Sequence, residues 1–210
     1  MRQKFDTKNW NRHEHYEFFK KFDQPFFGFT VNVKCNNVLE YCSDNNFSFF
    51  LFYLHKIMLA INEVKNLKLR ICEDEVYLYD TINISPTIGR SDHTFGFSYM
   101  DFEEDFKEFH KRGKLEIERV MKEKGLCLSE NASRPDVVHF SSIPWFSFTS
   151  VSHARNFSYI DSVPKISLGR IQKEDKNPHI PLSIHAHHAL ADGYDVALFF
   201  EKIEKYLNLQ

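Results

Sequence analysis

A histidine doublet followed closely by an aspartate and a glycine is the part of this chain best suited to chemistry. His187 and His188 are adjacent, and Asp192 follows four residues after the second of them, just before Gly193. A neutral imidazole near pH 7 can take a proton from an alcohol. Gly193 permits a sharp turn, so the Asp192 carboxylate can fold back towards the loop that carries His188. The spacing therefore indicates a general-base site.

The residues before the doublet predict a β-strand that separates its two rings. Side chains alternate between the two faces of a strand, so Ile184, Ala186 and His188 share one face while His185 and His187 share the other. Only one histidine of the doublet can then be the working residue, and His188 lies at the end of the strand where the chain enters a loop.

Two other interpretations of these residues stay open at this point. A strand, a solvated Asp-Gly turn and a helix with incidental histidines would give the same pattern. A metal site built on His185 and His187 is the other, although no cysteine or carboxylate ligand pattern accompanies them. We expect no metal.

The elements that must position the doublet follow from hydrophobic periodicity. Helices are expected over 11–22, 46–64, 102–124 and 196–207, and strands over 26–33, 67–71, 76–79, 137–142, 146–150, 165–172 and 180–187. Asp44 or Asn45 is the expected cap of the second helix, and Trp145 is expected in the core. Strands and helices mix without a regular βαβ rhythm, so we expect an α/β fold, a two-layer sandwich with a mixed β-sheet. No linker interrupts the pattern, which predicts a single domain over 1–210.

Composition narrows the classes of partner and cofactor. A formal net charge of −2 over 210 residues leaves no basic footprint for nucleic acid, and no polybasic or long apolar run indicates a membrane. The four cysteines lack metal-ligand spacing, and the N-terminus lacks an apolar signal core, so we expect a cytoplasmic protein. Any coenzyme must be bound without a glycine-rich phosphate cradle, because no such motif occurs.

Four segments, in order, resemble one family. Residues 187–193, His-His-Ala-Leu-Ala-Asp-Gly, resemble the His-His-x-x-x-Asp-Gly signature of coenzyme A-dependent acyltransferases. Residues 10–16 are similar to the Trp-x-Arg-x-Glu-His-Phe element of chloramphenicol acetyltransferases, and residues 144–150 to their Pro-Trp-x-x-Phe-x-Ser segment. Asp80 and the pair Thr94-Phe95 also stand at positions that match the chloramphenicol acetyltransferases. The resemblance covers nearly the whole chain and implies the fold of that family.

The resemblance implies roles for the residues of the reaction centre. His188 would be the general base that activates an acceptor hydroxyl for direct attack on acetyl-CoA, without an acyl-enzyme. Ser150 would stabilise the tetrahedral intermediate, and Ser167 stands where the family has a threonine that helps to bind it. Asp192 would form a structural pair with Arg12, and losing one partner of such a pair costs roughly 3–5 kcal/mol when it is buried.

The resemblance also implies how the two substrates are bound. Phe18, Phe19 and Phe27 would lie at the acceptor pocket, and Lys165 stands where the family has an apolar residue that lines it. A lysine there is costly unless it is paired or turned outward. Arg170 would contact a phosphate of the coenzyme. The family forms homotrimers whose active sites lie between subunits.

These implications predict an acetyl-CoA-dependent O-acetyltransferase, most simply of chloramphenicol, which would confer antibiotic resistance. Two alternatives remain open: an acetyltransferase for a different hydroxyl or thiol acceptor, and a non-catalytic CoA-binding trimer. A dihydrolipoyl acyltransferase core shares the histidine motif, but these 210 residues include neither a lipoyl domain nor flexible linkers.

Overall fold

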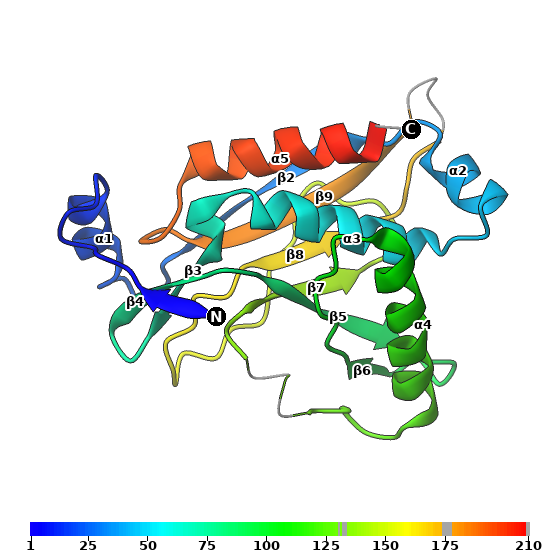
Figure 1. Cartoon of the computed structure of the whole chain (residues 1–210), viewed down its shortest axis with the longest axis horizontal. Helices are drawn as coiled ribbons and strands as arrows, with labels where there is room; N and C mark the ends of the chain where they lie inside the picture. Colours follow the sequence, from blue (N-terminus) through cyan, green and yellow to red (C-terminus); the bar gives the residue numbers. More distant parts are fainter. Residues whose placement is uncertain (130, 132–133, 174–177, 209–210) are drawn as a thin grey trace.

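The computed structural model describes residues 1–129, 131, 134–173 and 178–208 (Figure 1). Its helices are α1 (His13–Phe19), α2 (Val38–Asp44), α3 (Phe49–Asn62), α4 (Phe106–Lys122) and α5 (Gly193–Asn208), with a 3-10 turn, η1 (Lys65–Lys68). Its strands are β1 (Arg2–Lys4), β2 (Phe26–Lys34), β3 (Leu69–Cys72), β4 (Glu75–Tyr79), β5 (Asn83–Gly89), β6 (Phe95–Phe97), β7 (Val137–Ser142), β8 (Lys165–Leu168) and β9 (His179–His187).

A mixed six-stranded sheet forms the centre of the molecule. Its strand order is β2-β9-β8-β7-β5-β6, in which β5, β7 and β8 run parallel and the other pairs are antiparallel. The helices α3 and α5 lie together over one face of this sheet (Figure 1). A separate sheet of order β1-β4-β3 contains the hairpin that the sequence predicts. The predicted α/β fold with a mixed sheet is confirmed.

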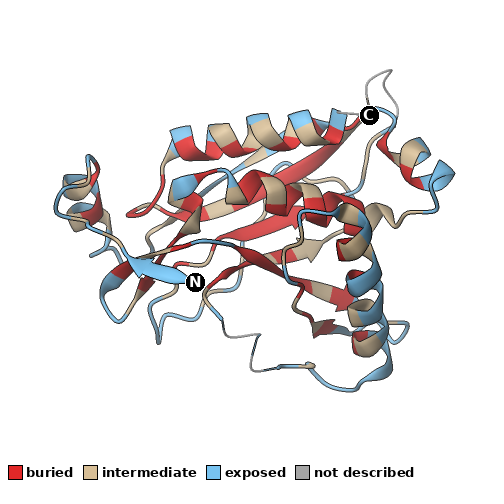
Figure 2. Ribbon diagram, in the orientation of Figure 1, coloured by how far each residue is buried: buried red, intermediate tan, exposed pale blue. Residues whose placement is uncertain are grey.

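The two faces of β8 and β9 differ in polarity. Ile166, Ile184 and Ala186 belong to the main apolar core beneath the helices. Lys165 and Ser167 alternate with Ile166 and therefore project from the opposite face of the sheet. The strands are largely buried on both sides, whereas the outer surfaces of the helices are exposed (Figure 2).

The long helix predicted over 46–64 is wrong at its N-terminal end. Asn46 adopts a positive φ of 55°, which ends the preceding helix α2 instead of starting α3. The cap of α3 is Ser48, whose side chain accepts a hydrogen bond from the backbone N of Leu51 at 3.4 Å. A hydroxyl immediately before the apolar run was the better signal than the acidic and amide residues further upstream.

The strand predicted over 146–150 and the buried Trp145 are also wrong. The segment after β7 turns across the end of β8, where the backbone N of Ile143 donates to the carbonyl of Leu168 and that of Arg170 donates to Phe146. The indole of Trp145 is 74% exposed in the single chain. Alternating apolar residues here belong to an irregular surface segment. Within the part of the chain that the structure describes, no helix is long and apolar enough to cross a membrane.

Candidate active site

His188 is the first residue beyond β9, and two aromatic rings hold its side chain. Its backbone N donates to the carbonyl of Pro25 at 2.8 Å, which fixes the loop against the chain that leads into β2. The imidazole stacks on Phe19 of α1, with centroids 3.9 Å apart and planes 15° apart. Phe27 of β2 packs at 4.4 Å from the ring. Two of the three expected pocket aromatics therefore contact the predicted base, whereas the third, Phe18, is largely exposed.

One hydrogen bond assigns the proton on the His188 ring. Nδ1 lies 3.2 Å from the carbonyl oxygen of Ala191. A carbonyl oxygen only accepts hydrogen bonds, so Nδ1 carries the proton in the neutral ring and Nε2 carries the free lone pair. The Nε2 atom is thus the one that can accept a proton.

The structure brings Arg12 and Asp192 together as the sequence predicts. The Arg12 guanidinium forms an ion pair with the Asp192 carboxylate and also donates to the carbonyl of His188 at 3.2 Å. The backbone N of Tyr194 donates to the same carboxylate at 2.9 Å, at the start of α5. The pair therefore joins α1, the His188 loop and α5. The His188 ring is hydrogen-bonded to the Ala191 carbonyl and not to this carboxylate, which is consistent with a structural role for Asp192.

His187, the other member of the doublet, points to the opposite side of the sheet. Its side chain is 4% exposed, and its Nδ1 accepts a hydrogen bond from the backbone N of Ala189 at 3.3 Å. Burial lowers the pKa of His187 to about 4, so the ring stays neutral at pH 7. Within the described ranges there is no cluster of three or more histidine, cysteine or acidic side chains arranged to hold a metal ion.

Ser167, one of the two serines expected at the reaction centre, lies far from His188 in the same chain. Ser167 pairs with Ser183 of β9, and His188 follows five residues later, so about 17 Å of strand separates them. The two side chains also lie on opposite faces of the sheet. Ser167 is 1% exposed, and its hydroxyl has no hydrogen-bond partner among the described residues. Ser150 lies exposed in the segment after β7. One chain does not bring the predicted base and the Ser167 hydroxyl together.

Comparison with known proteins identifies the family of this chain. The family model for chloramphenicol acetyltransferase matches residues 2–204. The chain belongs to the chloramphenicol acetyltransferase family. Chloramphenicol acetyltransferase 3 of Escherichia coli is 26% identical over 98% of this chain and 96% of its own length. The chloramphenicol acetyltransferase of Proteus mirabilis is 25% identical over 96% and 92%.

Solved structures extend the comparison to the fold. A chloramphenicol acetyltransferase superposes with a TM-score of 0.92 at 27% identity, over 99% of this chain and 100% of the other. A probable dihydrolipoamide acetyltransferase from Listeria monocytogenes shares the fold at 16% identity, with a TM-score of 0.67 over 92% and 88%. Family membership makes this chain an acyltransferase, and acetyl-CoA is the co-substrate of its family.

An apolar cavity of about 660 Å³ opens at the carboxyl ends of β5 and β7 in this acetyltransferase. Its walls include Phe50, Ile88, Ile117 and the exposed Trp145. Arg170 follows the end of β8 at the same edge of the sheet, and its backbone bonds to Phe146, next to the cavity. Sequence reasoning missed this cavity, because its walls come from four separate segments of the chain.

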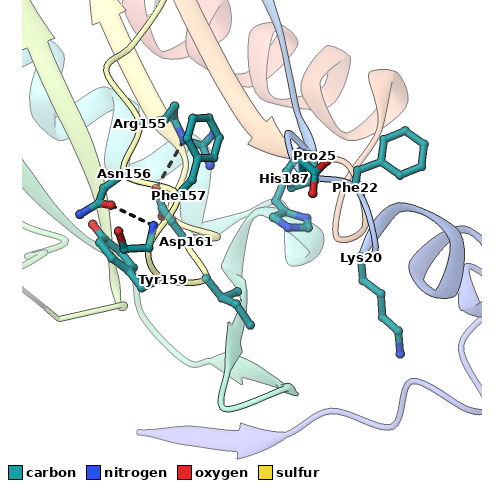
Figure 3. A pocket seen from close by; sticks show the side chains of 12 residues that line it. Lys20, Phe22, Pro25, Arg155, Asn156, Phe157, Tyr159, Asp161 and His187 are labelled. Atoms are coloured by element: carbon teal, nitrogen blue, oxygen red, sulfur yellow. Dashed lines mark hydrogen bonds and ion pairs between the residues drawn. The ribbon is translucent and has the colours of Figure 1, made fainter.

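Lys165 is turned inward and paired. Its Nζ atom donates to the Asp161 carboxylate at 2.5 Å and to the carbonyl of Val163 at 3.2 Å. Arg155 lies beside the same carboxylate, with its Nε 3.9 Å from Asp161 Oδ2. Figure 3 shows Arg155 and Asp161 on one side of a hollow of about 480 Å³, with His187 on the other. Sequence reasoning missed Arg155 and Asp161, although the four-residue spacing of Asp161 and Lys165 was visible.

Proposed function

We propose that this chain is an acetyl-CoA-dependent O-acetyltransferase, a single domain that acts as a cytoplasmic homotrimer with His188 as general base. The observation that carries the proposal is the bond between His188 Nδ1 and the Ala191 carbonyl, which leaves Nε2 free to accept a proton. The stacked ring of Phe19 keeps this orientation fixed.

The reaction is a direct transfer. His188 Nε2 takes the proton of the acceptor hydroxyl, and the oxygen attacks the thioester carbonyl carbon of acetyl-CoA. The tetrahedral intermediate collapses by breaking the carbon–sulfur bond, and the imidazolium returns the proton to the leaving thiolate. The products are the acetyl ester and free CoA, and no acyl-enzyme forms.

Two hydroxyls are assigned to the intermediate. Ser150 donates a hydrogen bond to the oxyanion, and Ser167 assists in binding the intermediate. The buried Ser167 hydroxyl has no hydrogen-bond partner among the residues that the structure describes. Buried hydroxyls normally have one, so a partner supplied by the bound intermediate supports this assignment.

The separation of these groups supports an active site between subunits. His188 lies beyond one end of β9, about 17 Å along the strand from the level of Ser167 and on the other face of the sheet. A second copy of the chain is needed to place a serine beside the base. In a closed ring of three copies, each interface would pair the His188 of one subunit with the serines of the next.

The coenzyme is assigned to the apolar cavity at the carboxyl ends of β5 and β7. Ligands of sheets with parallel strands commonly bind at that edge. Arg170 is exposed beside it, where its guanidinium can meet a phosphate of CoA. The acceptor then enters from the other side, past Phe18, Phe19 and Phe27.

Chloramphenicol, the substrate in the names of the relatives, is the first candidate acceptor. A different hydroxyl acceptor is the second, and the buried charges at Arg155 and Lys165 favour it. Thiol release from acetyl-CoA with chloramphenicol, followed by mass analysis of the acetylated product, tests the first. Release with another hydroxyl or a thiol compound supports the second. A protein that binds acetyl-CoA yet releases no thiol with any acceptor would be a non-catalytic CoA-binding protein, and the enzymatic proposal would be wrong.

A further inference from the structure

Two cations and one carboxylate are buried together beside β8. Arg155, Lys165 and Asp161 have side chains that are 10%, 9% and 11% exposed. Both cations also lie over the ring of Phe26, with Arg155 Cζ 3.5 Å and Lys165 Nζ 5.0 Å from its centroid. The cluster carries one more positive than negative charge.

The excess charge belongs mainly to Arg155. Lys165 takes the Asp161 carboxylate at 2.5 Å, while Arg155 stays 3.9 Å away. The Nε–H of Arg155 is buried and has no hydrogen-bond partner among the described residues. Burying a charged N–H donor without a hydrogen-bond acceptor is unfavourable, so this donor indicates that a ligand completes the cluster.

His153 adds a second unpartnered polar atom to the cluster. Its ring packs edge-on against His185 at 4.9 Å, and its buried Nε2 has no partner within the described part of the chain. Burial, and then the neighbouring side chains of His185, Lys165 and Arg155, lower the pKa of His153 to about 4. The neutral ring can still donate one hydrogen bond.

The position of the cluster assigns it to the acceptor and not to the coenzyme. Lys165 is the first residue of β8 and Ser167 lies two residues further on the same face. Arg170 and the apolar cavity lie beyond the other end of the same strand. Ser167, which is assigned to the intermediate, therefore lies between the proposed coenzyme cavity at the carboxyl end of β8 and the basic cluster at its amino end.

We infer that Arg155, Lys165 and His153 form a subsite for an anionic group, a carboxylate or a phosphate, on the acceptor. The inference rests on the proposed acetyl transfer and names its substrate class. The enzyme then prefers hydroxyl compounds that carry a negative charge to neutral ones, chloramphenicol included. The guanidinium supplies the charged donors and the Lys165–Asp161 pair sets its position against Phe26.

Matched acceptors test the inference by kinetics. N-benzoylserine is compared with its methyl ester, and glycerol phosphate with glycerol, so that one pair reports on a carboxylate and the other on a phosphate. We expect kcat/KM for the anionic member of at least one pair to exceed that of its neutral partner by about tenfold or more. Arg155→Gln should abolish this preference, and Arg155→Lys should keep part of it.

Further variants separate charge recognition from folding and from coenzyme binding. Lys165→Met combined with Asp161→Asn removes one positive and one negative charge and leaves Arg155 as the remaining charge of the cluster. Because the pair that positions Arg155 is lost, the variant should reduce the preference while the trimer persists. Lys122→Gln removes an exposed lysine on α4 and should change nothing. A preference for the neutral member in both pairs would overturn the inference. So would an Arg155→Gln variant that raises KM for acetyl-CoA but leaves the acceptor preference intact.

Binding keeps the test independent of turnover. If no acceptor is acetylated, the proposed function fails, and calorimetric titration of N-benzoylserine and its methyl ester still decides the subsite. Tighter binding of the free acid to the wild type, lost in Arg155→Gln, supports the subsite. Equal binding of acid and ester contradicts it.

Discussion

The position of one proton on the His188 ring decides what that residue can do. The Ala191 carbonyl holds the proton on Nδ1, and the pair Arg12–Asp192 holds the loop that carries both residues. A general base therefore needs no carboxylate in contact with its ring. We therefore expect Asp192 to affect the rate only by fixing the shape of the loop.

Asp192→Asn tests this division of labour. We expect a loss of about 2 kcal/mol in the free energy of unfolding, below the figure for a fully buried pair, because the Asp192 side chain is 36% exposed. The value of kcat should fall, while the pH dependence of kcat keeps its shape, because Asp192 carries no proton in the reaction. In a double-mutant cycle, Arg12→Met should cost little more once Asp192 is gone. A displaced pH profile would make Asp192 part of the proton transfer.

Residues that act through local spacing were predictable from the sequence. His188 and Asp192 lie in one short motif, and Arg12 was found through the resemblance of its own segment. Arg155 and Asp161 were not predictable, because only tertiary packing brings Arg155 against Phe26 and a carboxylate six residues away. The paired state of Lys165 likewise needed the structure.

Among the elements, the contact between β2 and β9 positions the base. Gly28 faces His185 across this pair, and a Cβ atom at Gly28 would stand 2.4 Å from Cδ2 of that ring. Gly28 of β2 thus leaves room for the ring of His185, which lies on β9 three residues before His188. The pairing of β2 and β9 depends on that space.

Gly28→Ala should destabilise the protein by about 1–3 kcal/mol, because a rigid ring must move to admit the methyl group. Chemical denaturation measures the change. Gly89→Ala is the matched control, since a Cβ there meets nothing within 4 Å, and it should be close to neutral. Adding His185→Ala to Gly28→Ala should recover part of the loss. Equal effects of the two glycine substitutions would mean that the ring yields freely.

Element type was predictable from the sequence where a strong period extends over many residues, as in α4, α5, β7 and β9. Boundaries failed where one residue overrode the pattern, as Asn46 does before α3. The irregular segment at 143–150 has the apolar pattern of a strand. Its first residues line the cavity at the edge of the sheet instead of entering the core, so the pattern led to the wrong prediction.

For the whole molecule, the separation of His188 from Ser167 predicts that active sites form between chains. Co-expressing His188→Ala subunits with Ser150→Ala subunits should then create some interfaces with both residues intact. Each trimer that contains both variants has one such interface out of three, so purified mixed trimers should show about a third of the wild-type activity. Purification of mixed trimers by two different tags, followed by an activity assay, measures this recovery.

The two parent variants, assayed separately and after mixing without subunit exchange, are the controls. Activity of the mixed trimers no higher than the average of the parents would place the complete site within one chain. It would also contradict the inference, drawn from the sheet, that His188 and Ser167 of one chain are too far apart to form one site.

The most direct test of acetyl transfer by His188 is the steady-state rate of thiol release from acetyl-CoA, in the wild type and in His188→Ala. The acceptor is a hydroxyl compound that the wild type acetylates. Loss of the base should lower kcat by about 10²–10⁴-fold and leave KM for acetyl-CoA nearly unchanged. His15→Ala, on the exposed side of α1, is the matched control and should keep the wild-type rate. A His188→Ala enzyme that retains more than about a tenth of the wild-type kcat would contradict the assignment of the base.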